Sequence, residues 1–265
     1  MQVTTDEPAR PRIQQQRDRF GLWTKTALEH GVLGSWEERA YKSFVTRVLD
    51  PRFPCFFAAK AQREGQLLYG FADSTEHPTD LLKIYVSLLG YLELVDHLTG
   101  MEKIMATLIL FIKPVTNRSV EEYVQQAWGV MQFLHDYDTT EWPPEVPGNP
   151  DQPSWSFCFD GTPLFVNIST PAHQDRKSRN LGEALTLVIQ PRDGFDVVAG
   201  DTPSGRQVRN TIRNRIVAHD RIPPSPELGQ YRDEEKREWR QYGLRDTNDP
   251  ALGACPFRKK GISDV

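Results

Sequence analysis

The stretch from Trp155 to Asp196 decides the fold and reads WSFCFDGTPLFVNISTPAHQDRKSRNLGEALTLVIQPRDGFD. It begins with two apolar runs, Trp155–Phe159 and Leu164–Ile168, which flank the tetrapeptide Asp160-Gly161-Thr162-Pro163. Glycine accepts a positive φ without steric cost, so an Asp-Gly pair between two β-rich runs predicts a β-hairpin. A third apolar run, Ala184–Ile189, predicts another strand after a polar connection. Connections between strands commonly carry binding and catalytic side chains.

Outward from this stretch, helices and strands alternate. Apolar residues recur at helical spacing over Asp80–Leu98, and Ser119 begins a second helix as its N-cap, with Glu122 completing a capping box. The continuous apolar run Met105–Ile112 predicts a central strand that is covered on both faces. Phe53–Lys60 and Gln66–Ala72 are expected to form a strand pair around the Arg63-Glu64-Gly65 turn.

The pattern predicts an α+β protein, a single layered domain with a mixed β-sheet flanked by helices. We expect a flexible N-terminal segment over residues 1–16, one domain over residues 17–248 and a C-terminal tail over residues 249–265. Ser204–His219 has the spacing of a basic helix, and its arginines are expected to form a solvated surface.

Composition argues against several classes of protein. A net charge of −4 is not that of a general nucleic-acid binder. No apolar run reaches the ~20 residues that a membrane-spanning helix needs, and the N-terminal residues do not resemble a secretion signal. We therefore expect a cytoplasmic protein without a nucleic-acid or membrane partner. The three cysteines are far apart and form no CxxC pair, which argues against a disulfide framework or a structural zinc site.

Two histidines stand out among the six. His173 follows Pro171-Ala172 in the polar connection, close to several arginines and to the aromatic strand residues Phe157 and Phe165. His135 falls on the apolar face of its helix, a position where most histidines are ordinary core residues, and Asp138 follows it three residues later.

An anionic ligand would explain the cluster of Arg176, Lys177, Arg179 and Arg192, although surface ion pairs would explain it too. The planar guanidinium group binds carboxylates and phosphates through paired hydrogen bonds. A histidine, aromatic walls and several arginines together suit haem, since imidazole can ligate iron and guanidinium groups can pair with the propionates. From the residues alone, haem and other planar anionic ligands remain alternatives.

Several motifs together resemble the YqcI/YcgG family. They are Phe53-Pro54-Cys55, Leu134-His135-x-x-Asp138, Trp142-Pro143, Trp155-x-Phe157-Cys158-Phe159-x-Gly161-x-Pro163-x-Phe165, Pro171-Ala172-His173-x-x-Arg176-x-Ser178-Arg179, Gln190-Pro191-Arg192 and Glu238-Trp239-x-Gln241-Tyr242. The resemblance covers roughly Phe53 to Asn248. It implies a haem-dependent monooxygenase that hydroxylates a guanidine nitrogen of arginine or of an arginine-derived small molecule.

The resemblance also implies roles for particular residues. His173 is the first choice as the ligand of a haem b iron; His135 is the second choice, as ligand or as proton donor, and Cys55 is the third. Arg176, Arg179 and Arg192 are expected to bind the propionates or a substrate carboxylate, and Phe157 to contact the cofactor. Asp138 is expected to act beside His135 in catalysis.

The expected partners are a guanidino substrate and an oxidant, namely O2 with an external reductant or peroxide. An electron-donor protein is a candidate partner, and the carboxylate that meets the guanidinium is left open among Asp138, Asp160 and Asp196.

Two other functions remain open at this point. One is a non-catalytic haem-binding protein, such as a sensor or carrier. The other is a non-haem metal enzyme that uses His135, His173 and Asp138. The apolar residues Trp239 and Tyr242 late in the chain would be consistent with a homodimer.

Overall fold

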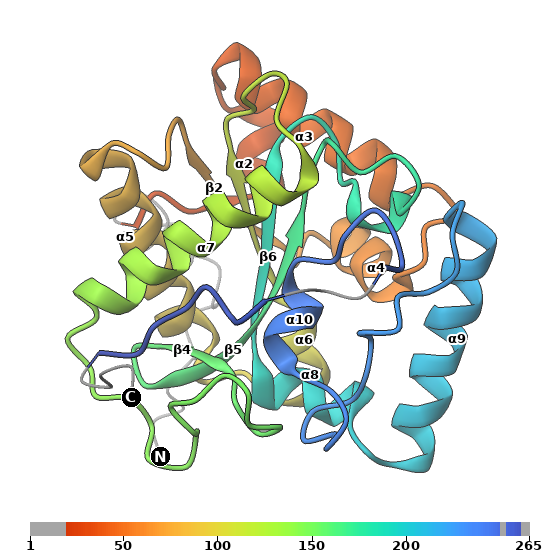
Figure 1. Cartoon of the computed structure of the whole chain (residues 1–265). Helices are drawn as coiled ribbons and strands as arrows, with labels where there is room; N and C mark the ends of the chain where they lie inside the picture. Colours follow the sequence, from red (N-terminus) through yellow and green to blue (C-terminus); the bar gives the residue numbers. More distant parts are fainter. Residues whose placement is uncertain (1–19, 250–252, 261–265) are drawn as a thin grey trace, which may run out of the picture.

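A six-stranded sheet forms the centre of the computed structural model, which describes residues 20–249 and 253–260 (Figure 1). The strand order is β1-β2-β3-β6-β5-β4. The strands are β1 (Trp23–Thr24), β2 (Leu68–Ala72), β3 (Leu108–Ile112), β4 (Phe157–Phe159), β5 (Thr162–Ser169) and β6 (Leu185–Pro191). β2 and β3 are parallel and the other neighbouring pairs are antiparallel. The predicted mixed sheet and α+β class are confirmed.

The predicted hairpin is present in register. Phe157 pairs with Leu164 and Phe159 with Thr162, and the turn residues Asp160 and Gly161 both have positive φ, at 49° and 67°. β5 then pairs with β6. β3 lies in the middle of the sheet and is buried along its whole length, as the continuous apolar run predicts.

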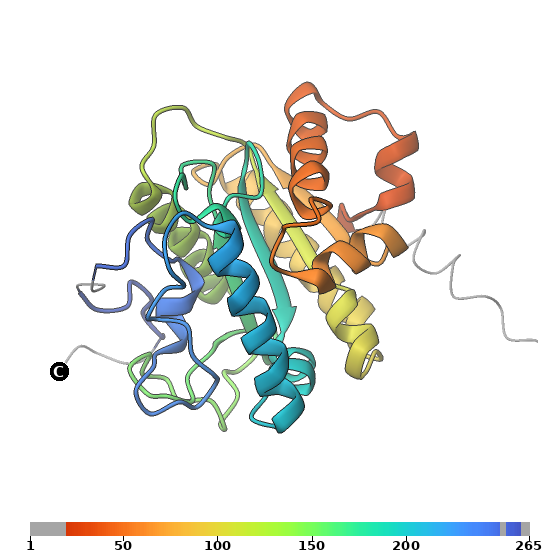
Figure 2. The same ribbon diagram turned by 90° about the vertical axis from the view of Figure 1, so that its right-hand side faces the viewer.

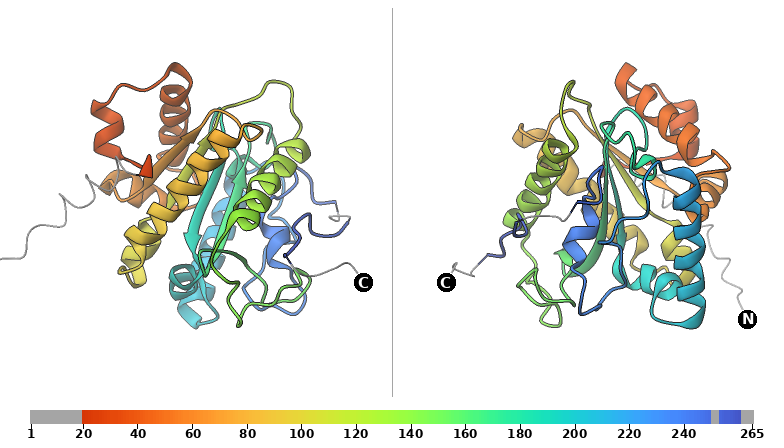
Figure 3. Two further views of the ribbon diagram at one scale, coloured as in Figure 1. Left: turned by 90° about the vertical axis from the view of Figure 1, so that its left-hand side faces the viewer. Right: turned by 45° about the vertical axis from the view of Figure 1, so that its right-hand side comes forward.

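Helices cover both faces of the sheet. They are α2 (Lys25–His30), α3 (Ser35–Val48), α4 (Phe56–Glu64), α5 (Pro78–Val95), α6 (Gly100–Met105), α7 (Val120–Tyr137), α8 (Arg192–Ala199), α9 (Pro203–His219) and α10 (Glu238–Tyr242), with the short 3-10 turn η1 at Lys177–Arg179. α5 and α7 lie against one face (Figure 3, left), and α3, α4 and α9 lie on the other side (Figure 2). The predicted Ser119–Glu122 capping box begins α7. Within the described residues, no helix is both long and apolar enough to cross a bilayer.

One predicted element is wrong. Phe53–Lys60 is not a strand, because helix α4 begins at Phe56 and runs to Glu64, whereas the predicted second strand exists as β2. The Arg63-Glu64-Gly65 segment is the end of this helix rather than a hairpin turn. Gly65 adopts a left-handed conformation at φ 69°, and its N–H donates to the carbonyl of Ala61, so glycine serves as a helix C-cap.

The late part of the chain packs into the body of the protein. Cys255 and Phe257 fall in the expected C-terminal tail, yet both are buried, and Phe257 contacts the rings of Trp155 and Phe157. The expected N-terminal segment, residues 1–16, lies outside the described residues. Trp239 and Tyr242 are buried within the chain itself, so these two residues do not form an exposed apolar surface.

Candidate cofactor and substrate site

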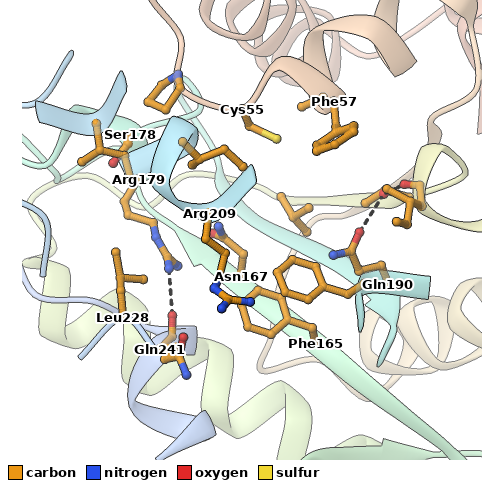
Figure 4. Close-up of a pocket in the computed structure, with 18 of the residues that line it drawn as sticks. Cys55, Phe57, Phe165, Asn167, Ser178, Arg179, Gln190, Arg209, Leu228 and Gln241 are labelled. Carbon is orange, nitrogen blue, oxygen red and sulfur yellow. Dashed lines mark hydrogen bonds between the residues drawn. The ribbon is translucent and has the colours of Figure 1, made fainter. Parts of the chain in front are cut away.

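A deep cavity lies between the sheet and α3, α4 and α9, and its volume is about 290 Å³ (Figure 4). Ligand sites in proteins typically measure about 300–1,000 Å³, so this cavity has the size of a small-molecule site. Apolar side chains from the sheet and the helices make much of the lining; they include Phe44, Phe57, Ala58, Ile109, Phe165, Val188 and Ile212. Five arginines also line it: Arg176, Arg179, Arg192, Arg209 and Arg213. Among the described residues, the lining includes no aspartate or glutamate.

The sheet provides a floor that carries two carboxamides. Asn167 of β5 and Gln190 of β6 both line the cavity, next to Phe165 and Val188. Asn167 pairs with Val188 and Phe165 with Gln190, which puts all four side chains on one face because side chains opposite each other in a sheet share a face. The Oγ of Ser169 donates to Asn167 Oδ1 at 2.9 Å, and the Oγ1 of Thr107 donates to Gln190 Oε1 at 3.2 Å.

Cys55 lies across the cavity from this floor, beside Phe57 (Figure 4). It is the N-cap residue of α4, and its side chain makes no capping hydrogen bond. Burial raises the pKa of the Cys55 thiol, while the nearby backbone amides of Ala58 and Phe57 and the charge of Arg215 act in the opposite direction. Amides at a helix N-terminus favour a thiolate, so a metal cation could displace the proton here.

Arg215 fixes the loop that leads into Cys55. Its guanidinium group donates to the carbonyls of Pro51 at 2.7 Å, Phe53 at 2.6 Å and Pro54 at 3.1 Å. α9 thereby holds the Phe53-Pro54-Cys55 motif against the cavity.

Arg176 and Arg179 line the cavity and also tie it to the end of the chain. Arg176 donates to the carbonyl of Arg245 at 2.7 Å, and Arg179 donates to the carbonyls of Gln241 and Tyr242 at 2.8 Å each. Burial lowers the pKa of Arg179 to about 9, and the charge of Arg176 adds to the shift. These contacts are with neutral oxygens, so neither guanidinium charge is cancelled by them.

Arg192 differs, because two carboxylates meet it. Its Nη1 contacts the buried Glu238 and its Nη2 lies 3.1 Å from Asp196, while the guanidinium group stacks 4.2 Å from the ring centre of Tyr231. Burial raises the pKa of Glu238 to about 7, since desolvation outweighs the opposing charge of Arg192. Arg192 Nε is buried and has no hydrogen-bond partner among the described atoms.

Arg209 and Arg213 also line the cavity, although we expected the arginines of this helix to form a solvated surface. Arg209 Nη2 donates to Gln230 Oε1 at 2.9 Å, and Arg213 Nη2 donates to the carbonyl of Leu228 at 3.2 Å. The signal was present in the sequence: both arginines directly follow or flank the apolar stripe of Val208, Ile212 and Ile216, which turns toward the cavity.

His173, our first choice for iron ligand, does not line the cavity. Its side chain is 1% exposed, with Nδ1 at 2.9 Å from Thr170 Oγ1 and Nε2 at 2.9 Å from the carbonyl of Leu244. Both ring nitrogens are engaged in holding the polar connection to the C-terminal segment. This geometry does not fit a role as metal ligand, and burial also lowers the pKa of the imidazole.

His135 and Asp138 come together at a different place. Both line a second pocket with Trp142 and Lys260, and the backbone N–H of Lys260 donates to His135 Nε2 at 2.9 Å. Phe157 packs into the core on the sheet face opposite the large cavity. The structure thus separates these three residues from Cys55 and the arginines. Over the described part of the chain, no three His, Cys, Asp or Glu side chains are grouped to bind a metal ion. The structure therefore gives no support to a non-haem metal enzyme.

Fold and site together define an α+β protein with a deep, arginine-lined ligand cavity. The model of the YqcI/YcgG family matches residues 41–258. The chain belongs to this family.

Three relatives cover most of the chain. A protein of Streptomyces lavendulae named "Putative N(omega)-hydroxy-L-arginine synthase DcsA" is 41% identical over 231 residues, 86% of each chain. YcgG of Bacillus subtilis (strain 168), named as uncharacterized, is 34% identical over 89% of this chain and 94% of its own length. YqcI of the same strain, also named as uncharacterized, is 32% identical over 90% of this chain and 94% of its own length. No solved structure matches the chain.

Proposed function

We propose that this protein is a haem-dependent monooxygenase that hydroxylates a guanidine nitrogen of arginine or of a closely related small molecule. The name of the Streptomyces relative supports the reaction, and the arginine-lined cavity supports the binding of an anionic ligand. The observation that carries the proposal is the placement of Cys55 and five arginines around one cavity.

The residues of this cavity fit a haem. Cys55 would hold the iron through its sulfur, in place of His173, because it is the candidate ligand that lines the large cavity. Phe57, Phe165 and the aliphatic lining would contact the macrocycle, and arginines would bind the two propionates. When bound, the haem would supply oxygen activation, which a thiolate ligand favours by electron donation.

The chain's own residues would position the reactants and exclude water. Arg215 holds the loop before Cys55 through three carbonyls, and α9 covers the cavity. The apolar lining keeps the reacting nitrogen away from bulk solvent. In the overall reaction, one atom of O2 ends as the hydroxyl on the guanidine nitrogen and the other leaves as water, with two electrons and two protons from an external reductant. With peroxide as the oxidant, peroxide supplies the oxygen and no reductant is needed.

The test is product analysis. Purified protein supplemented with haemin is incubated with L-arginine, a reductant and O2, and the products are analysed by mass spectrometry. We expect a product that carries one additional oxygen atom, located on the guanidine group by fragmentation. A haem-bound protein that never yields this product, with either O2 and reductant or peroxide, would instead be a binding protein without turnover.

A further inference from the structure

The charge of the cavity lining is one-sided. Its charged side chains are arginines, and no carboxylate belongs to the lining among the described residues. Glu238 and Asp196, the nearest acids named above, are already paired with Arg192. Two propionates would occupy two of the five guanidinium groups, which leaves cationic groups for a further anion.

Arg213 is the best placed of these groups. Arg179 and Arg176 donate to backbone carbonyls of the C-terminal segment, and Arg192 is held by two acids. Arg213 has one described hydrogen bond, to the carbonyl of Leu228, and lies one helical turn from Arg209 on the cavity side of α9. Residues four apart on a helix are neighbours on its surface, so the two guanidinium groups can meet one ligand group.

The floor of the cavity adds hydrogen-bond donors. The side-chain oxygens of Asn167 and Gln190 accept hydrogen bonds from Ser169 and Thr107, which directs the amide NH2 groups elsewhere. Both residues line the cavity, so those NH2 groups are available to a bound ligand. A lining of guanidinium and NH2 donors is complementary to a carboxylate.

We propose that the substrate is recognised through its carboxylate, which Arg213 binds from α9, and that substrates lacking this group are rejected. This inference rests on the proposed function and names its substrate class: a free guanidino acid. The guanidinium end gains no partner carboxylate from the lining, so its binding relies on the ring of Phe57 and on neutral oxygens. A decarboxylated substrate would keep the charge that the arginines repel and lose the group that they attract.

The test compares L-arginine with agmatine, its decarboxylated analogue. Dissociation constants are measured by calorimetry on the full chain, as purified and after haemin supplementation. A hydrogen-bonded charged contact contributes about 1.5–3 kcal/mol, so L-arginine should bind about ten- to a hundredfold more tightly than agmatine. Arg213→Leu should weaken the binding of L-arginine by a similar factor and should not weaken the binding of agmatine, because it removes a charge that repels agmatine. The variant should therefore lose the discrimination, while Arg213→Lys should retain part of it.

Arg206→Leu is the matched control, because Arg206 is an exposed arginine of the same helix that pairs with Asp201 at 2.6 Å outside the cavity. It should bind both compounds as the unmodified chain does. Equal affinity for L-arginine and agmatine, or no measurable binding of either, would overturn the inference. The inference would also be overturned if Arg213→Leu lost haemin binding but still bound L-arginine more tightly than agmatine, since Arg213 would then bind the cofactor.

Product analysis separates this inference from the proposed function. If agmatine is hydroxylated as efficiently as L-arginine, the proposed function stands and carboxylate recognition fails. If L-arginine binds in a carboxylate-dependent manner but gains no oxygen, carboxylate recognition stands and the proposed function fails.

Discussion

Cys55 and His173 show how the environment of a single residue decides its role. Both lie in motifs of the family, and the resemblance to the family makes the histidine the first choice as iron ligand. The direction of a side chain and the partners of its polar atoms depend on the packing of distant segments. The carbonyl of Leu244, which lies at hydrogen-bond distance from Nε2 of His173, belongs to a residue 71 positions away in the sequence. The position of Asn167 in the cavity lining, by contrast, could have been predicted, since strand alternation places it on the same face as Phe165.

At the residue scale, Glu238 predicts a measurable pH dependence of stability. A glutamate titrates near 4.5 when unfolded and at about 7 in this site, so the folded state binds more protons between these pH values. The free energy of unfolding should therefore fall as pH rises from 4.5 to about 7, by up to about 1.4 kcal/mol per pH unit from this group. Urea unfolding at several pH values measures this pH dependence of the free energy of unfolding.

The Glu238→Gln variant should lose this part of the slope, because glutamine does not titrate. Glu183→Gln is the control, since Glu183 is exposed and pairs with Arg39 on the surface. An unchanged slope in Glu238→Gln would mean that Arg192 keeps Glu238 ionised across the whole range.

At the scale of elements, the sequence predicted the helices and strands that have a strong local signal. The Asp-Gly hairpin, the capped helix α7 and the fully apolar strand β3 follow from turn chemistry, capping and burial. A strand was predicted over Phe53–Lys60 because a short aromatic run suits either structure, and Gly65 can end a helix as well as form a turn. The role of α9 was missed because its apolar stripe is broken by arginines that face a cavity.

α9 should therefore contribute more to ligand binding than to stability. Ile212 is half-buried and lines the cavity, whereas Leu134 of α7 is buried in the core. Ile212→Ala should weaken haemin binding at a cost of about 1 kcal/mol in the free energy of unfolding, while Leu134→Ala should cost about 2–5 kcal/mol. Haemin titration and urea unfolding of both variants provide the comparison; a cost for Ile212→Ala equal to that for Leu134→Ala would place α9 in the core.

At the scale of the whole molecule, the end of the chain closes the core. Phe257 is 1% exposed and packs on residues that precede it by about a hundred positions, a contact that no local pattern could predict. Phe257→Ala should lower the free energy of unfolding by about 3–5 kcal/mol. Lys260→Ala, an exposed substitution nearby, should change it by less than about 0.5 kcal/mol. Urea unfolding that gave equal, small changes would restore the expectation of a loose tail.

The most direct test of the central claim is a haemin titration followed by the absorption spectrum of the full chain. If Cys55 holds the iron, the chain should bind one haemin with a Soret band typical of thiolate ligation, and Cys55→Ala should lose or shift that band. Cys158→Ala, which changes a buried cysteine outside the large cavity, should leave it unchanged. An identical spectrum in Cys55→Ala, or no haemin binding by the unmodified chain, would contradict the account.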